Sequence, residues 1–309
     1  MNKEQANNYF GIAFMNTEMV ETDVKLNNST SVEQADGLRK NIIGMVLDGK
    51  YTVLSYMDIS TGEADLYMCT DGKEDYVAKV YRRKEAFDVE VTKRLQTIDS
   101  PFVAKVYSTG EVNGFLYEII PYYKMGCLAG KKFSYYQLKS TIIPALNEGL
   151  HVLHNNGIIH RDLKPSNIML ADNGQDAVII DYGISSIREF GKTTVKVATG
   201  MTLVYSSPEA IRGLYLNESD YYSLGITLYE LYCGQNPYTK MSPAEIEQFV
   251  VDQKLPLPTE MEDELKDLIT ALTYQDIRNR KDKANPNRRW GYGEVLKWCS
   301  GIAQPVPGK

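Results

Sequence analysis

The sequence predicts an α+β protein in which a small antiparallel β-sheet region precedes a larger, mainly helical region. Two observations carry this prediction. Short β-rich runs broken by turns fill the stretch from Tyr51 to Tyr123, and after Pro121 the spacing of apolar residues becomes mainly helical. The chain has 309 residues, of which 43% are hydrophobic and 24% charged. That length and composition are typical of a globular protein with a substantial buried core.

The expected sheet has one helix inserted among its strands. Asp71-Gly72 and Asn113-Gly114 are hairpin signals, because both pairs tolerate the positive φ angles of tight turns. Apolar residues recur at approximately helical spacing over 84–98, which predicts the inserted helix. The β-rich runs predict strands at 51–56, 65–70, 76–81, 103–108 and 115–120.

The larger region follows the sheet, and its helices are separated by one long irregular stretch. Residues 157–209 contain short apolar runs, glycines and turn residues, and the polar motifs of the chain lie there. Residues 1–43 are rich in Asn, Thr, Ser and Glu, so we expect a flexible or weakly helical extension, and 301–309 resemble a linker. The expected helices are 134–155, 219–233, 243–251, 261–272 and 292–299.

Charge and cysteine content exclude several classes of function. A net charge of −6 and a pI near 5.3 argue against general binding to nucleic acid or anionic lipid, since both require a basic surface. The sequence contains no stretch approaching the ~20 apolar residues of a membrane helix. The four cysteines form no C-x-x-C pair, which fits a reducing, cytoplasmic setting. An oligomeric state is not defined by these features.

A dense polar segment, His160 to Asn167, lies between two apolar runs. Asp162 can accept a proton or orient a hydroxyl, Lys164 can neutralise a phosphate oxygen, and Asn167 offers an oxygen to a hard metal ion. Together these groups are suited to phosphoryl transfer. A plain surface loop would explain any one of these residues, but it does not explain all of them in this order.

A second motif follows, in which the apolar run 178–180 ends in Asp181. With Asn167, Asp181 would supply oxygen ligands for magnesium, an ion that also binds substrate phosphates and water. Taken alone, Asp181 is equally well explained as a residue that caps a turn. The polar segment upstream favours the metal site.

The two motifs resemble the catalytic loop H-R-D-L-K-P-x-N and the metal-binding D-F-G of the protein kinase family, with Tyr182 in place of phenylalanine. The resemblance covers about residues 48–300. It implies a bilobal protein kinase fold, with a small lobe at about 44–120, a hinge at about 121–126 and a large lobe at about 127–300. It also implies ATP as cofactor with Mg²⁺ or Mn²⁺, and transfer of the γ-phosphoryl group of ATP by Asp162 and Lys164.

The same resemblance assigns the residues that hold the nucleotide. Lys79 would contact the α- and β-phosphates, and Glu90 would pair with Lys79, with Glu85 as the alternative. The glycine-rich loop departs from the family pattern, because in 59–64 only Gly62 remains. Residues with side chains restrict the approach of backbone N–H groups to phosphate. The adenine contacts would come from Leu66, Val77, Ile120 as gatekeeper, Pro121, Tyr123 and Met169.

Resemblance also indicates the substrate class and regulation. Lys164, two residues after Asp162, and Thr202, seven residues before Glu209, match kinases that phosphorylate Ser or Thr of proteins. Arg161 beside Asp162 is typical of kinases whose activation segment is ordered by phosphate, so we expect autophosphorylation at Thr193, Thr194 or Thr199.

Other residues would be structural. Asp220 would brace the catalytic loop, and Glu209 would form a buried ion pair with Arg289. The main alternative function is a pseudokinase scaffold that binds nucleotide without transferring phosphate, which the altered glycine loop favours. A kinase-like enzyme acting on small molecules is the third possibility, although such enzymes generally lack an equivalent of Thr202.

Overall fold

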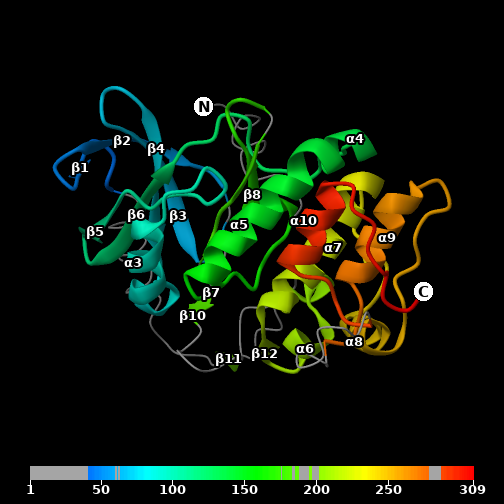
Figure 1. The fold of residues 1–309 in the computed structure, drawn as a ribbon. Helices are drawn as coiled ribbons and strands as arrows, with labels where there is room; N and C mark the ends of the chain where they lie inside the picture. The colour runs from blue at the N-terminus through cyan, green and yellow to red at the C-terminus, as the bar shows by residue number, and fades with distance from the viewer. Residues whose placement is uncertain are drawn as a thin grey trace.

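The computed structural model describes residues 41–59, 61, 63–174, 176–182, 185–187, 195–196, 202–277 and 287–309. A β-sheet lobe with helix α3 (Val89–Thr97) lies on one side, and a lobe of helices lies on the other (Figure 1). This arrangement confirms the predicted α+β class and its bilobal kinase-like architecture.

The small lobe is built on a six-stranded sheet in the order β1-β2-β3-β4-β6-β5, with every neighbouring pair antiparallel. Asn113 and Gly114 join the last two strands in sequence with φ angles of 51° and 85°, and Gly72 has a φ of 85° after β3, as the hairpin signals predicted. The strands are β1 (Val46–Leu47), β2 (Tyr51–Met57), β3 (Ala64–Thr70), β4 (Asp75–Tyr81), β5 (Ser108–Val112) and β6 (Phe115–Pro121).

Two sequence predictions in this lobe were wrong in detail. The predicted strand 103–108 is not in the sheet, because Val103 and Val106 pack into the core of the large lobe and β5 begins only at Ser108. The single helix predicted over 84–98 is a 3-10 turn at Lys84–Ala86 followed by α3. Asp88 accepts hydrogen bonds from the backbone N–H groups of Glu90 and Val91, so it caps a new helix start.

The large lobe is organised around α5 (Ile143–Asn155), which runs through its centre (Figure 1). A Cβ on Gly149 of α5 would lie 2.9 Å from the carbonyl oxygen of Phe102, so glycine allows this helix to pack closely against the backbone at Phe102. Five other helices are close to the predicted ranges: α4 (Tyr135–Gln137), which a π-helical segment (Leu138–Ile142) joins to α5, α7 (Asn217–Cys233), α8 (Pro243–Asp252), α9 (Asp263–Leu272) and α10 (Tyr292–Cys299). The short helix α6 (Pro208–Ile211) was not predicted.

Short paired strands frame the polar segment between α5 and α7. β7 (Ile158–Ile159) pairs with β10 (Ser186–Ile187), β8 (Ile168–Leu170) pairs with β9 (Ala177–Ile179), and β11 (Val195–Lys196) pairs with β12 (Leu214–Tyr215). The segment from His160 to Asn167 therefore connects two buried strands, β7 and β8. Within the described residues, no helix combines the length and apolar character needed to cross a membrane.

Candidate active site

The backbone of the polar segment is held from below by α7. The carboxylate of Asp220 accepts the N–H of His160 at 2.9 Å and that of Arg161 at 2.8 Å, while His154 Nε2 lies 2.8 Å from the same carboxylate. Burial by itself raises the pKa of Asp220, but the contact with His154 and these hydrogen bonds outweigh burial and lower it. Asp220 thus fixes the turn at Arg161, whose φ is 71°.

Three predicted residues bind the carboxylate of a fourth, Asp162. Thr202 Oγ1 donates to Asp162 Oδ1 at 2.6 Å, and Lys164 Nζ lies 2.7 Å from Asp162 Oδ2. The amide nitrogen of Asn167 donates to the same Oδ2 at 3.0 Å, and Lys164 Nζ also donates to Thr202 Oγ1 at 3.0 Å. Asp162 is therefore held at the centre of a network of donors, where an acceptor hydroxyl could also bind.

His160 connects this network to the strand that carries Asp181. Its Nδ1 accepts the backbone N–H of Asp162 at 3.2 Å, so Nε2 carries the ring proton and donates to the carbonyl of Ile180 at 3.0 Å. The ring also packs edge-on against Tyr182, with centroids 5.6 Å apart. Tyr182 carries a hydroxyl that the phenylalanine of the D-F-G pattern lacks, and this hydroxyl donates to the carbonyl of Ile179 at 2.7 Å.

Lys79 of the small lobe and Asp181 of the large lobe form an ion pair where the two lobes meet. Lys79 Nζ lies 2.6 Å from Asp181 Oδ1, and Lys79 is 7% exposed. Burial raises the pKa of Asp181, but the ammonium of Lys79 outweighs it and lowers the pKa to about 2. Burial likewise lowers the pKa of Lys79, and the carboxylates of Asp181 and Glu118 reverse that effect, so the pKa is raised. Both groups are charged at neutral pH.

The donor set at this point fits a magnesium ion. Asn167 uses its amide nitrogen to bind Asp162, which directs the amide oxygen away from that carboxylate. Asp181 has an ionised carboxylate on a side chain that remains 40% exposed although Oδ1 binds Lys79. Hard oxygen ligands of this kind are what Mg²⁺ prefers.

An apolar cluster at the junction of the lobes contains most of the residues expected around adenine. Leu66, Val77 and Met169 are buried in this cluster, with Ile120 and Tyr123 packed against it. Pro121 ends β6 at the start of the link between the lobes. The structure brings these side chains to one place from both lobes, as an adenine pocket requires.

The loop between β2 and β3 is held by a residue that the sequence did not single out. Arg82 Nη1 donates to the carbonyl of Thr61 at 2.7 Å, and Arg82 binds Asp65 Oδ1 through Nε at 3.1 Å and Nη2 at 2.8 Å. Asp65 is 2% exposed, so this is a largely desolvated bond. The available signal was an acid on one strand, Asp65, and an arginine just after the end of the next strand, Arg82. Gly62 and the candidate phosphosites Thr193, Thr194 and Thr199 lie outside the described residues.

Glu63, the last residue of the loop between β2 and β3, interacts electrostatically with Lys79 and Asp181. Its pKa is raised because it is partly buried, while nearby Lys79 acts in the opposite direction.

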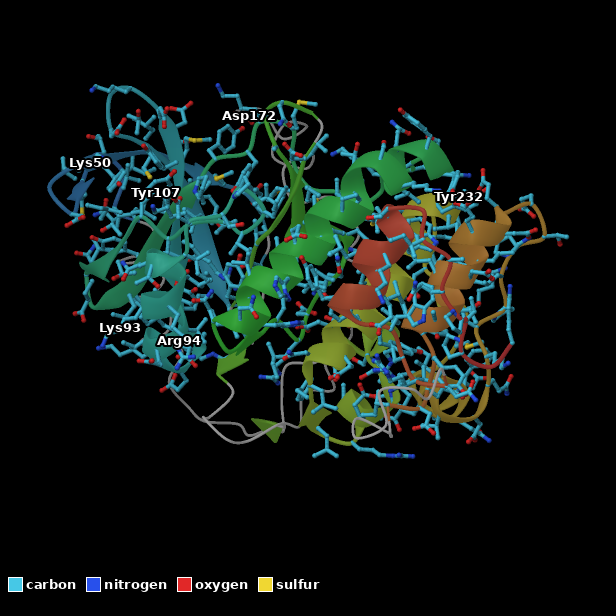
Figure 2. All side chains as sticks on the ribbon, viewed as in Figure 1. Lys50, Lys93, Arg94, Tyr107, Asp172 and Tyr232 are labelled. Carbon is cyan, nitrogen blue, oxygen red and sulfur yellow. The ribbon has the colours of Figure 1, made fainter. Side chains whose placement is uncertain are left out.

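The expected pair between Lys79 and Glu90 is not formed in the structure. Glu90 is on the outer face of α3, with a side chain that is 61% exposed and Oε1 3.4 Å from Arg94 Nε; Arg94 is labelled in Figure 2. Because the cap at Asp88 sets the phase of α3, its inner face carries Val91, Thr92 and Leu95. Glu85, the alternative, is exposed in the preceding 3-10 turn.

A buried ion pair supports the segment that follows Thr202. Arg289 Nη1 and Nη2 bind the two carboxylate oxygens of Glu209 at 2.6 and 3.1 Å, and Ser219 Oγ donates to Glu209 at 2.8 Å. Burial raises the pKa of Glu209, but Arg289 outweighs burial and lowers it. The pair ties α6 to the end of the large lobe, as the resemblance implied.

Comparison with known proteins agrees with this geometry. The family model described as "Protein kinase domain" matches residues 60–285. Calcium-dependent protein kinase 5 of Plasmodium falciparum (isolate 3D7) is 31% identical over 221 residues, which cover 66% of this chain and 38% of that protein. The serine/threonine-protein kinase AtPK1/AtPK6 of Arabidopsis thaliana is 28% identical over 222 residues, covering 67% of this chain and 44% of that protein.

The class of protein follows from these findings. A two-lobed α+β fold in which Lys164 and Asn167 bind Asp162, and Asp181 binds Lys79 of the other lobe, is that of a phosphotransferase domain. The chain belongs to the protein kinase family. It spans less than half the length of the curated relatives it matches.

Proposed function

We propose that this chain is an ATP- and Mg²⁺-dependent protein kinase that transfers the γ-phosphoryl group to serine or threonine hydroxyls of protein substrates. The observation that carries the proposal is the bonding of Asp162 to both Lys164 and Thr202, at 2.7 and 2.6 Å. Relatives named as serine/threonine kinases support the substrate class.

Each residue of the network has a role in such a transfer. Asp162 would orient the acceptor hydroxyl and take its proton, since its position is fixed by three side-chain donors. Lys164 would neutralise charge on the transferred group, and Thr202 would keep Asp162 and Lys164 in register. Asn167 and Asp181 would hold Mg²⁺, which supplies charge neutralisation at the phosphate oxygens when bound.

The small lobe would hold the nucleotide. Lys79 would bind phosphate oxygens, and the cluster of Leu66, Val77 and Met169 would enclose the adenine. Ile120, Pro121 and Tyr123 would line its edge at the link between the lobes. Phosphorylation at Thr193, Thr194 or Thr199 would bring an anion to Arg161, which lies beside Asp162.

The proposal is tested by incubating the protein with labelled ATP, Mg²⁺ and a generic protein substrate. Label incorporation by the wild type that is lost in Asp162→Ala is the expected result. The contradicting result is a wild-type protein that is folded and already phosphorylated when purified, and that binds ATP without incorporating label into the substrate. That result would indicate a nucleotide-binding scaffold. Phosphopeptide mass spectrometry of the same sample tests the three candidate phosphosites.

A further inference from the structure

Helix α3 does not supply the carboxylate that Lys79 was expected to have. Its sequence contains one acidic residue, Glu90, and that side chain is turned outward toward Arg94. The inner face of α3 instead presents Thr92, which is 4% exposed. In the structure Lys79 pairs directly with Asp181, so any second carboxylate that stabilises this buried ammonium must come from an element other than α3.

Glu118 is placed to be that partner. It lies on β6, directly across from Lys79 of β4 in the antiparallel register, and is 7% exposed. Side chains of directly opposed residues project from the same face of a sheet, with Cβ atoms about 4.5–5.5 Å apart. The Glu118 carboxylate therefore emerges beside the Lys79 side chain on the face that α3 covers.

Two hydroxyl groups hold the Glu118 carboxylate in place. Thr92 Oγ1 of α3 donates to Glu118 Oε1 at 2.7 Å, and the Tyr81 hydroxyl of β4 donates to Oε2 at 2.7 Å. Both bonds are buried, and the Tyr81 ring also lies 5.0 Å from Lys79 Nζ. One carboxylate thus connects α3, β4 and β6 at the position that pairs with Lys79 in the sheet.

The other charged groups around Lys79 have different tasks. Asp181, 2.6 Å from Lys79 Nζ, is the residue expected to hold the cation, so it would give up part of its contact with Lys79 when nucleotide binds. Glu63 approaches from the loop between β2 and β3 on the nucleotide side. Glu118 is the carboxylate held by the sheet and by α3, away from that side.

We propose that Glu118 is the positioning residue of Lys79, taking on a sheet strand the role that a helix glutamate was expected to fill, with Thr92 as its link to α3. A long lysine side chain loses rotamer freedom when it is fixed in place, so a fixed neighbour of opposite charge helps to hold it. Glu118 keeps Lys79 fixed at the phosphate position once Asp181 turns to the metal. This inference rests on the proposed function only for the identity of the nucleotide.

The first test measures binding of the non-hydrolysable analogue AMP-PNP with Mg²⁺ by calorimetry. Glu118→Gln keeps the shape and one acceptor but removes the charge, and we expect about tenfold weaker binding. Glu90→Gln is the matched control, an exposed carboxylate on α3, with a change below about twofold. Thr92→Val keeps the charge of Glu118 and is expected to weaken binding by no more than about threefold.

A second test needs no nucleotide and no activity. Thermal unfolding is compared for wild type, Lys79→Met, Glu118→Gln and the double variant. If the residues interact, the double variant is more stable than the sum of the single effects by about 2–4 °C or more. Glu90→Gln combined with Lys79→Met is expected to be additive. Failure of the proposed function would leave this coupling unchanged.

Three results would overturn the assignment. One is unchanged or tighter AMP-PNP binding in folded Glu118→Gln. Another is strict additivity with Lys79→Met, which would make Glu118 a structural residue of the sheet. Should Glu118→Gln alone not fold, the double variant is compared with Lys79→Met. If Glu118 and Lys79 interact, adding Glu118→Gln to Lys79→Met should cost no further stability, because it removes a buried carboxylate that already lacks its cation. A further loss of several degrees would contradict the interaction.

Discussion

The large-lobe half of the site and the small-lobe half reach their geometry in different ways. In the large lobe, Asp162, Lys164 and Asn167 lie within six residues of one another and bond directly to each other. In the small lobe, Lys79 depends on Glu118, which is 39 positions away in sequence and adjacent only through the pairing of β4 with β6. A short motif specifies the first half, and sheet register specifies the second.

This difference explains which part of the site could depart from the family pattern. The catalytic network leaves little freedom, because each donor binds a carboxylate whose position the others also fix. Charge behind Lys79, by contrast, can come from any strand or helix that reaches the same buried space. The loop between β2 and β3 shows the same freedom, since Arg82 holds the Thr61 carbonyl in a loop that has few glycines.

The largest effect is expected for Asp162→Asn in the large lobe. The change keeps the shape of the side chain but removes its ability to accept a proton, so transfer should slow by about 10²–10⁴-fold. AMP-PNP binding should stay within a few fold of wild type, because Asp162 faces the acceptor and not the nucleotide. Steady-state kinetics alongside calorimetry would check both values. If Asp162→Asn lost AMP-PNP binding as well as phosphoryl transfer, Asp162 would also contribute to the nucleotide site.

The buried pair of the large lobe gives the next effect, on stability. Arg289→Met leaves Glu209 buried without its cation and should cost about 3–5 kcal/mol in denaturant unfolding. Arg288→Met is the matched control, because its bond to Glu294 is more exposed and such pairs contribute about 0–1 kcal/mol. Equal losses in the two variants would refute the structural role of Arg289.

The same pair predicts how stability depends on pH. In the folded protein the pKa of Glu209 is below its ordinary value of 4.5. The stabilisation is therefore present above about pH 4.5 and is lost as pH falls through the lower folded value. Glu209→Gln should flatten this part of the acid unfolding profile. A variant profile as steep as that of wild type would assign the acid sensitivity to other carboxylates.

In the small lobe, Arg82→Met tests whether the arginine substitutes for glycine in shaping the loop. The change leaves Asp65 buried with fewer partners, so stability should fall by about 1–3 kcal/mol. AMP-PNP binding should weaken as the loop loosens. Arg83→Met, an exposed neighbour, serves as control. If folded Arg82→Met binds AMP-PNP as tightly as wild type, the contacts of Arg82 do not shape the phosphate site.

The smallest effect is expected for Thr202→Val. Removing the hydroxyl breaks one bond to Asp162 and one from Lys164, but Lys164 still contacts Asp162 directly. Transfer should slow by about tenfold, in line with the net value of a hydrogen bond to a charged group. Thr202→Ser, which retains the hydroxyl, should recover most of the rate. Equal rates for Val and Ser would remove Thr202 from the network.

The sequence was most informative where local patterns decide structure. The predicted helices of the large lobe and four of the five predicted strand ranges lie within a few residues of the observed elements, and the hairpin glycines adopt the expected positive φ. The strand at 103–108 failed because its apolar residues are equally suited to the core of the other lobe, where they pack. The predicted pairing of Glu90 with Lys79 was wrong because the orientation of Glu90 depends on where α3 begins. A shift of one residue turns a helix side chain by about 100°.

The most direct test of the account is phosphoamino-acid analysis after reaction with labelled ATP and Mg²⁺, using wild type and Asp162→Asn on a protein substrate rich in Ser, Thr and Tyr. A serine/threonine kinase that uses Asp162 would give labelled phosphoserine and phosphothreonine with wild type and a loss of about 10²-fold or more with Asp162→Asn. Label confined to phosphotyrosine, or incorporation that is equal in the two proteins, would contradict it.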